Sequence, residues 1–450
     1  MLRRIALLLK KKLVNVAGSK PDLLSIPDDV SFAAIDGTPV TAGGYVFSEF
    51  GINSRKNSIL GISQCRSSVI KIQIKEEPNK ANTLEQEAQF LAELNAADCI
   101  SAPRLLSTGS LAPSEVPFAS FGLERKQESE RYSYIIMQYI PSASTVSIAD
   151  VLLAIVEQQK LGYFHGDIKP NNVRFDPEQK ICILIDYDQS QRLTQEQRDM
   201  TPHEFLLWAM GQTFRDSSSK VKIDALHDER KRNAYFNGNA FRIDSTTLYK
   251  EQMTTNSESG VYHSFATPDV FADGSRILGT REQWLKKIAV TPDEKVLDVG
   301  CNGGVVSFYM HDRGASVTGI DVDQCIVTAA QILANIFNKN VSFSALNLDD
   351  AETLPEYDTV LLFSVIHHTE KLERNCSLLA TRCNRILIEC RLVEKGKGPR
   401  GKHWKDTSEW NFESIEDLQK GLENLFAPHK VVRTFGPGDK GRFLFELIKD

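Results

Sequence analysis

Short apolar segments alternate with segments of helical spacing from Lys295 onward, and many of the apolar segments end in glycine or an acidic residue. This alternation constrains the fold strongly, because consecutive strands joined by helices lie parallel in one sheet. It therefore predicts an α/β domain in the second half of the chain. The expected strands are Val296–Val299, Ser316–Ile320, Val341–Leu346, Thr359–Phe363 and Arg385–Glu389.

The first half of the chain has a different order of elements. Tyr45–Ile74 alternates apolar runs with polar turns, which predicts a small antiparallel sheet. Two segments, Leu84–Leu94 and Ile148–Glu157, have helical spacing. Further short strands are expected at Tyr134–Ile140, Val173–Phe175 and Ile181–Ile185. The first half is thus an α+β unit.

The chain has 450 residues, which predicts about two domains. A polar stretch from Ser217 to Arg232 favours a boundary near residue 235, so we expect a basic segment at 1–29 and a first domain at 30–235. These are followed by a linker and extension at 236–290 and by a second domain at 291–450. The hydrophobic content of 41% is typical of a soluble protein. The net charge of −6 makes nucleic acid a less favoured partner.

The N-terminal segment carries Arg3, Arg4, Lys10, Lys11 and Lys12 around a short apolar run. One interpretation is a basic amphipathic helix lying on an anionic membrane surface. The other, which we favour, is a frayed or packed N-terminal helix. The eight cysteines include no CxxC pair, which predicts reduced thiols rather than disulfides or a zinc site. We expect a cytoplasmic protein, with peripheral contact to the inner membrane face under the first interpretation.

The segment Tyr163–Val173 reads Tyr-Phe-His-Gly-Asp-Ile-Lys-Pro-Asn-Asn-Val and resembles the catalytic loop of the protein-kinase-like superfamily. The resemblance implies that Asp167 is the catalytic aspartate, whose carboxylate lies beside the attacking hydroxyl. Lys169 then neutralises the transferred phosphoryl group, and Asn172 holds Mg²⁺. His165 is expected to support the loop rather than to react.

Other residues match the same superfamily in the correct order. Asp186 ends an apolar run and resembles its metal-binding aspartate, although Asp188 replaces the glycine of that motif. Lys71 resembles the strand lysine that grips the nucleotide phosphates. Its helix partner is expected to be Glu87, with Glu85 as the alternative.

The adenine site is the weakest part of this match. Met137, Gln138 and Tyr139 resemble the hinge that takes adenine, but no GxGxxG loop is present. Gly51 and Gly61 are expected to bracket a longer nucleotide lid. The short distance from the hinge to Asp167 favours a small-molecule or glycan hydroxyl over a protein substrate. A pseudokinase remains the alternative to an active kinase.

The segment Glu294–Gly304 resembles motif I of the Rossmann-like methyltransferases. Its D-x-G-x-x-G pattern is formed by Asp298, Gly300 and Gly303, where glycines let the backbone approach a cofactor closely. Asp321 ends the next strand, where a carboxylate can bind ribose hydroxyls. A dinucleotide oxidoreductase is the structural alternative.

Two later segments follow the order of the methyltransferase family. Asp349 ends the third strand and is expected to contact adenine, with Asp350 as the alternative. After the fourth strand, His367 is expected to orient or deprotonate the acceptor. His368 is the alternative residue, and a purely structural histidine is the alternative role.

Two regions around this domain bear on substrate binding. Tyr262 and Arg276 lie in a segment that resembles an N-terminal extension closing over cofactor or substrate in some methyltransferases, as does Arg281. A basic aromatic insertion follows the fifth strand and is either an anionic-acceptor site or a solvated loop. It contains Arg391, Lys395, Lys397, Arg400, Lys402, His403, Trp404, Lys405 and Trp410.

Together the resemblances imply two domains, an α+β bilobal protein-kinase-like fold followed by an α/β Rossmann-like methyltransferase. The expected cofactors are ATP, Mg²⁺ and S-adenosylmethionine. Fusions of this kind are similar in chemistry to O-antigen chain-terminating kinase-methyltransferases of polysaccharide biosynthesis, which implies a glycan or other small-molecule acceptor. The alternatives are a pseudokinase that regulates a methyltransferase, and a methyltransferase that acts on RNA or a natural product.

Overall fold

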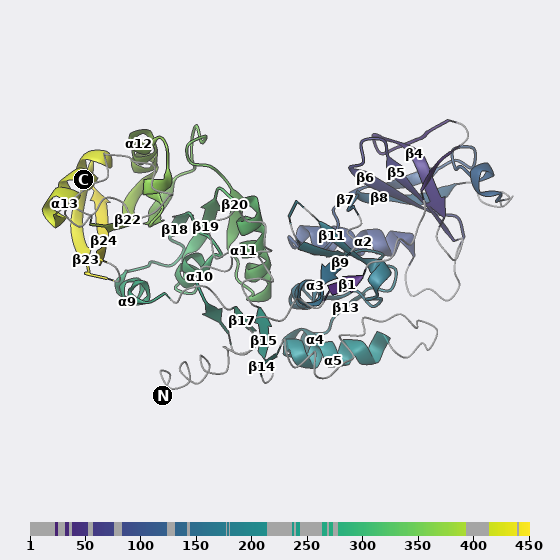
Figure 1. Ribbon diagram of the computed structural model, residues 1–450, viewed down its shortest axis with the longest axis horizontal. Helices are drawn as coiled ribbons and strands as arrows, with labels where there is room; N and C mark the ends of the chain where they lie inside the picture. Colours follow the sequence, from purple (N-terminus) through teal and green to yellow (C-terminus); the bar gives the residue numbers. More distant parts are fainter. Residues whose placement is uncertain are drawn as a thin grey trace.

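The computed structural model separates into an N-terminal and a C-terminal unit (Figure 1). It describes residues 23–25, 32–35, 38–52, 57–75, 83–123, 131–141, 145–176, 178–179, 181–213, 236–237, 240–243, 263–267, 270–272, 278–392, 414–438 and 441–450. The expected basic segment Met1–Lys12 and most of the insertion after Arg391 lie outside these ranges.

The N-terminal unit begins with an antiparallel sheet of the order β2-β4-β5-β6-β8-β7, with β3 paired to β4. Its strands are β2 (Ala33–Ala34), β3 (Val40–Ala42), β4 (Tyr45–Ile52), β5 (Ser58–Ser63), β6 (Ser68–Gln73), β7 (Leu105–Leu111) and β8 (Tyr132–Gln138). Helix α2 (Leu84–Ala96) begins at a capping box in which Thr83 and Gln86 bond each other's backbone. The predicted sheet and helix are confirmed.

The rest of this unit is organised around α3 (Ile148–Leu161), whose residues are buried from Ile148 to Gln159. A helix buried on all sides needs neighbours on all sides. They include the pairs β1 (Leu23–Ser25) with β9 (Thr145–Ser147), β10 (Tyr163–Phe164) with β13 (Gln191–Arg192), and β11 (Val173–Asp176) with β12 (Ile181–Leu184). The short helices are η1 (Ala119–Phe121), η2 (Pro170–Asn172), α4 (Gln195–Asp199) and α5 (Pro202–Thr213). Strand β1 thus pairs within this unit, although its residues fall in the segment 1–29 that was expected to precede the first domain.

A small sheet of the order β14-β15-β17-β16 follows, in the expected linker region. Its strands are β14 (Phe236–Asn237), β15 (Ala240–Ile243), β16 (Phe265–Ala266) and β17 (Val270–Ala272), and α9 (Thr280–Lys287) comes next. The ring of Phe236 lies 4.7 Å from that of His203, and the ring of Phe265 lies 5.5 Å from that of Phe308. The linker therefore touches both units.

The C-terminal unit is built on one sheet of the order β20-β19-β18-β21-β22-β24-β23. Its strands are β18 (Lys295–Val299), β19 (Ser316–Asp321), β20 (Ser342–Ala345), β21 (Tyr357–Phe363), β22 (Cys383–Arg391), β23 (His429–Phe435) and β24 (Arg442–Lys449). Its helices are α10 (Val305–His311), α11 (Gln324–Ile336), η3 (Ile366–His368), α12 (Leu372–Arg382) and α13 (Ile415–Leu425). The five predicted strands are confirmed and lie parallel, but β24 pairs antiparallel with β22.

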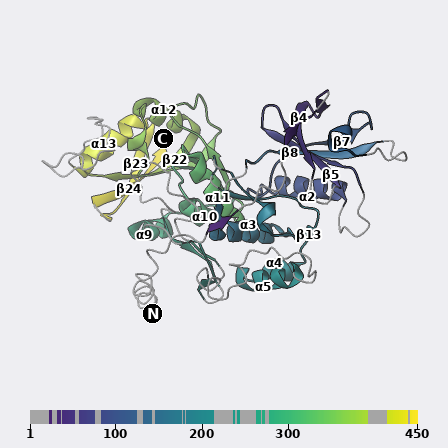
Figure 2. The same cartoon turned by 45° about the vertical axis from the view of Figure 1, so that its right-hand side comes forward.

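The two units meet where α11 lies against α3, and both views show these helices adjacent (Figures 1 and 2). The side-chain amide of Asn335 donates to Glu157 Oε1 at 2.7 Å and to the carbonyl of Asp98 at 3.1 Å. Glu157 is fully buried and also accepts from the backbone N–H groups of Ile100 and Ser101. This carboxylate is therefore hydrogen-bonded from both units at once.

Within the described residues, no helix is both long and apolar enough to cross a lipid bilayer. Of the cysteines whose side chains are described, Cys65 is exposed and the others are buried in the cores.

Candidate functional sites

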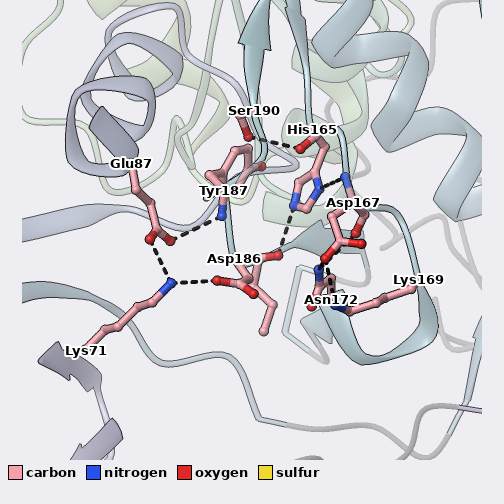
Figure 3. A network of polar contacts seen from close by, with 10 residues as sticks. Lys71, Glu87, His165, Asp167, Lys169, Asn172, Asp186, Tyr187 and Ser190 are labelled. Carbon is pink, nitrogen blue, oxygen red and sulfur yellow. Dashed lines mark hydrogen bonds and ion pairs between the residues drawn. The ribbon is translucent and has the colours of Figure 1, made fainter. Parts of the chain in front are cut away.

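Lys71 is the centre of a polar network in the N-terminal unit (Figure 3). Its ammonium donates to Glu87 Oε2 at 2.7 Å and to Asp186 Oδ1 at 2.6 Å. Glu85, the alternative partner, instead accepts from Ser133. Three segments far apart in sequence thus converge on one buried cation.

The charges of this network stabilise one another. Burial lowers the pKa of Lys71, but the carboxylates of Asp186 and Glu87 outweigh that effect and raise it. Burial raises the pKa of Glu87, against the opposing effect of Lys71. Glu87 Oε1 also accepts from the backbone N–H of Tyr187 at 3.2 Å. The helix α2 is therefore tied both to β6 and to the segment after β12.

Asp167 lies in a loop after β10, between two donors. Its Oδ2 accepts from Lys169 Nζ at 2.6 Å and from Asn172 Nδ2 at 2.9 Å. The ring of His165 holds the loop from behind, since Nε2 lies 2.9 Å from the carbonyl of Ile185 and Nδ1 accepts from the N–H of Asp167. The loop residues expected to act together do lie together, and His165 has the supporting contacts expected of it.

Three carboxylates gather beside this loop. Asp167, Asp186 and Asp188 each offer one oxygen, and these oxygens lie within 4.8 Å of one another. Asp186 adopts a left-handed conformation with φ of 68°, which is uncommon for a residue other than glycine. Carboxylate oxygens are ligands that Mg²⁺ prefers. Asp188 was not assigned this role from the sequence, although the triplet Asp-Tyr-Asp was the available signal.

The expected adenine edge lies at the end of β8. Met137 is buried in the sheet, and the backbone N–H of Tyr139 donates to the carbonyl of Ser67 at 3.0 Å. Gly51 and Gly61 lie inside β4 and β5, and residues 53–56 of the expected lid lie outside the described ranges. A Cβ on Gly61 would lie 2.4 Å from the ring of Phe50. Gly61 therefore makes room for a core side chain.

The turn after β18 has the backbone geometry expected of a close cofactor approach. Gly300, Asn302 and Gly304 all have positive φ, at 69°, 48° and 80°. A Cβ on Gly300 would lie 2.5 Å from Val365 Cγ2, so only glycine fits there. The N–H of Asn302 donates to Asp321 Oδ2 at 3.1 Å, and the N–H of Gly303 donates to Asn302 Oδ1 at 2.7 Å. Asp321 thus lies at the rim of the turn.

Asp298 supports this turn from inside the unit. It is buried and accepts a 2.6 Å hydrogen bond from the hydroxyl of Ser307 on α10. Burial raises the pKa of Asp298 to about 7, opposed by the Ser307 bond and reinforced by Asp321. Its contacts tie β18 to α10, which begins at the turn.

Asp349 holds the start of α12. Its Oδ2 accepts from the N–H of Glu370, and its Oδ1 accepts from the N–H of Lys371 and from Asn375. These donors outweigh burial and lower the pKa of Asp349. The neighbouring Asp350 accepts from the side chain of Asn347. The carboxylate expected to contact adenine therefore already has strong structural partners.

His367 and His368 lie in η3, directly after the residue that contacts Gly300. Their rings are 4.1 Å apart. Burial, with smaller effects from His368 and Arg442, lowers the pKa of His367 to about 3. At neutral pH this imidazole is uncharged and is a weak base.

A buried ion pair not assigned from the sequence lies at the same edge of the sheet. Glu389, near the end of β22, accepts through Oε2 from Arg281 Nε at 2.9 Å and from the hydroxyl of Ser364 at 2.8 Å. Nη1 of Arg281 lies 2.8 Å from His263 Nε2. Ser364 has a positive φ of 58°. An acid at the carboxyl end of a predicted strand was the signal that could have singled out Glu389.

Comparison with known proteins bears on the second unit. Residues 297–385 match the family model described as a methyltransferase domain. The C-terminal half contains a methyltransferase domain. Over 90 residues it is 37% identical to a ubiquinone biosynthesis O-methyltransferase of Pseudomonas savastanoi pv. phaseolicola, and over 109 residues 31% identical to that of Dechloromonas aromatica. These alignments cover 20% and 24% of the chain, and 39% and 45% of the relatives, so the chain spans less than half the length of each.

Solved structures similar to part of this chain include magnesium protoporphyrin IX methyltransferase from Synechocystis PCC 6803, at 21% identity and a TM-score of 0.31. That match covers 38% of this chain and 81% of the other. Another is WbdD, at 20% identity and a TM-score of 0.31, covering 42% of this chain and 44% of the other.

Some residues singled out from the sequence lie outside the described residues. They are Tyr262, Arg276 and the insertion after Leu392.

Proposed function

We propose that the chain is a bifunctional enzyme that joins an ATP-dependent phosphotransferase to an S-adenosylmethionine-dependent methyltransferase. The expected acceptor is a glycan or another small molecule. The observation that carries the first activity is the convergence of Lys71, Glu87 and Asp186 beside Asp167 and Asn172. The matched methyltransferase domain and its glycine turn support the second.

In the phosphotransferase, Lys71 would bind the nucleotide phosphates while Glu87 keeps it in place. Asp186 and Asp188 offer carboxylate oxygens suited to Mg²⁺, which would supply charge neutralisation when bound. Asn172 would add its side-chain oxygen, as the resemblance implies. Asp167 would accept the hydrogen bond of the attacking hydroxyl and orient it. Lys169, already paired with Asp167, would turn toward the negative charge of the transferred group.

In the methyltransferase, Gly300 and Gly303 would let the backbone approach the cofactor closely. Asp321 would accept from the ribose hydroxyls, and Asp298 would keep the turn in place through Ser307. Bound S-adenosylmethionine supplies an electrophilic methyl group. His367 would hydrogen-bond the acceptor, and Asp349 would support the adenine side of the site.

The test is a double-label assay on the whole protein. The whole protein is incubated in cell extract with γ-labelled ATP and methyl-labelled S-adenosylmethionine, and the labelled products are separated by mass. We expect Asp167→Ala to abolish phosphate transfer, while Asp199→Ala, a change at an exposed acid of α4, leaves it intact. Asp321→Ala should abolish methyl transfer, with Asp312→Ala as its matched control.

Phosphate label that persists at wild-type level in Asp167→Ala would exclude this assignment. Methyl transfer without any phosphate transfer by the wild type would favour a regulatory pseudokinase. Methyl label on RNA would favour the other alternative acceptor.

A further inference from the structure

Tyr187 joins the two acids Asp186 and Asp188 in the chain, and its own contacts hold it on two sides (Figure 3). Its backbone N–H donates to Glu87 Oε1 at 3.2 Å. Its ring lies 4.6 Å from that of His165. Because Tyr187 is bonded covalently to both acids, a displacement of this residue would move both of their carboxylates.

The hydroxyl of Tyr187 makes a further contact, with a side chain that no sequence motif singled out. Gln158 Nε2 on α3 donates to this hydroxyl at 2.7 Å. Both residues are 1% exposed. A buried amide and a buried phenol that bond each other are costly to separate, because each would lose a hydrogen bond away from water. The bond therefore resists any movement of the Tyr187 side chain.

Gln158 also contacts the segment that leads into the metal site. The same Nε2 lies 3.4 Å from the carbonyl of Ser101, and that carbonyl accepts from the N–H of Leu184 at 3.0 Å. Leu184 ends β12, two residues before Asp186. One buried amide thus contacts the chain on both sides of Asp186, through Ser101 on one side and directly at Tyr187 on the other.

The backbone of Asp186 requires such support. Its φ of 68° lies in the left-handed region, which a residue other than glycine adopts at a cost and keeps only where its surroundings hold it. The ion pair with Lys71 holds the Asp186 side chain. The contacts of Leu184 and Tyr187 hold the backbone on either side of it.

We propose that Gln158 and the hydroxyl of Tyr187 are positioning groups of the phosphotransferase site. Their bond keeps Asp186 and Asp188 in the arrangement that binds Mg²⁺, so that both carboxylates are in place before the nucleotide arrives. Neither group contacts the reacting atoms, and both act through the two acids. The inference rests on the proposed phosphotransferase function and adds two residues to it.

The experiment is calorimetry on the whole chain with the β,γ-imido analogue of ATP, at a series of Mg²⁺ concentrations. Tyr187→Phe keeps the ring and removes only the hydroxyl. We expect it to raise the Mg²⁺ concentration needed for half-maximal binding about tenfold, as the loss of one buried hydrogen bond allows. Binding of the analogue without Mg²⁺ should not change, because Lys71 keeps its contact with Glu87.

Tyr132→Phe is the matched control. Tyr132 is buried on β8 in the same unit, and its hydroxyl has no hydrogen-bond partner among the described residues. This variant should have the Mg²⁺ dependence of the wild type.

A double variant separates positioning from stability. Gln158→Met leaves the buried hydroxyl of Tyr187 without its donor, whereas Gln158→Met/Tyr187→Phe leaves an apolar pair. We expect the double variant to unfold at a temperature closer to that of the wild type than Gln158→Met does. It should nevertheless keep the raised Mg²⁺ requirement, because the directional bond is still missing. It is also the variant to measure if a single variant does not fold.

Wild-type Mg²⁺ dependence in Tyr187→Phe or in the double variant would overturn the positioning role. An equal rise in Tyr132→Phe, or analogue binding by the wild type that does not depend on Mg²⁺, would do the same. Failure of the wild type to bind the analogue at every Mg²⁺ concentration would instead overturn the proposed phosphotransferase function, and this inference with it.

Discussion

Lys71 Nζ lies 2.6 Å from Asp186 Oδ1, although the two residues are 115 positions apart in the chain. The contact joins the antiparallel sheet to the segment after β12, so both are held in one arrangement before any ligand binds. The same lysine is bonded to Glu87, which makes it the common partner of two acids.

The buried Lys71–Glu87 pair makes a prediction about stability. We expect Lys71→Met to reduce the free energy of unfolding by about 3 kcal/mol, because it leaves Glu87 buried without its cation. The double variant Lys71→Met/Glu87→Leu should recover most of this loss, since an apolar pair needs no desolvation of charge. Urea unfolding measures both. A double variant less stable than Lys71→Met would contradict this expectation. Neither variant should bind ATP, because both lack Lys71.

Asp186 makes a prediction about metal dependence. Asn tolerates the left-handed backbone found here and Lys71 keeps its bond to Glu87, so Asp186→Asn should still fold, although it loses the ion pair with Lys71. It should weaken the Mg²⁺-dependent part of ATP binding at least tenfold, because a charged metal ligand is lost. Calorimetry with and without Mg²⁺ measures this, with Asp199→Asn as control. Equal Mg²⁺ dependence in Asp186→Asn and wild type would remove Asp186 from the metal site.

The raised pKa of Asp298 predicts how the stability of the fold changes with pH. Its pKa is raised from 3.8 to about 7 in the folded protein, so the folded state binds the proton more tightly than the unfolded state. Its contribution to stability is therefore fully present below about pH 4 and is lost as pH rises through about 7. Without ligand, the wild type should lose more thermal stability than Asp298→Asn between pH 5 and pH 8. Parallel curves for the two proteins would argue against the shift.

The hydrogen bond from Asn335 to Glu157 between the two units leads to a fourth prediction. Asn335→Asp places a second carboxylate against buried Glu157, so we expect about 1–3 kcal/mol of destabilisation that diminishes at low pH. Gln419→Glu, on an exposed hydrogen bond to Thr434, is the matched control. Thermal unfolding and limited proteolysis between pH 5 and pH 8 measure the effect. Equal behaviour of the two variants would mean that Asn335 contributes little to the interface.

Local pattern predicted the central strands of both units and two helices of the first, and the resemblance to the protein-kinase-like superfamily supplied the set of residues around Lys71. It left Glu85 and Glu87 as alternatives, because residues two apart on a helix face different directions and the sequence does not say which face meets the lysine. The structure gives that contact to Glu87.

The contacts that were not predicted depend on how segments distant in the sequence pair with each other. The opposition of Arg391 and Arg442 depends on how β24 pairs with β22, and a shift of one residue would place Arg442 on the other face. No local pattern determines that register across about 50 intervening residues. The ion pair of Arg281 with Glu389 likewise joins segments 108 residues apart.

The hydrogen bond from Asn335 to Glu157 also has an evolutionary consequence. A carboxylate shared by the two halves means that neither half can change its side of the contact independently, because loss of the Asn335 donor removes one of the hydrogen bonds that stabilise a buried charge. Across lineages, positions 157 and 335 should therefore vary together.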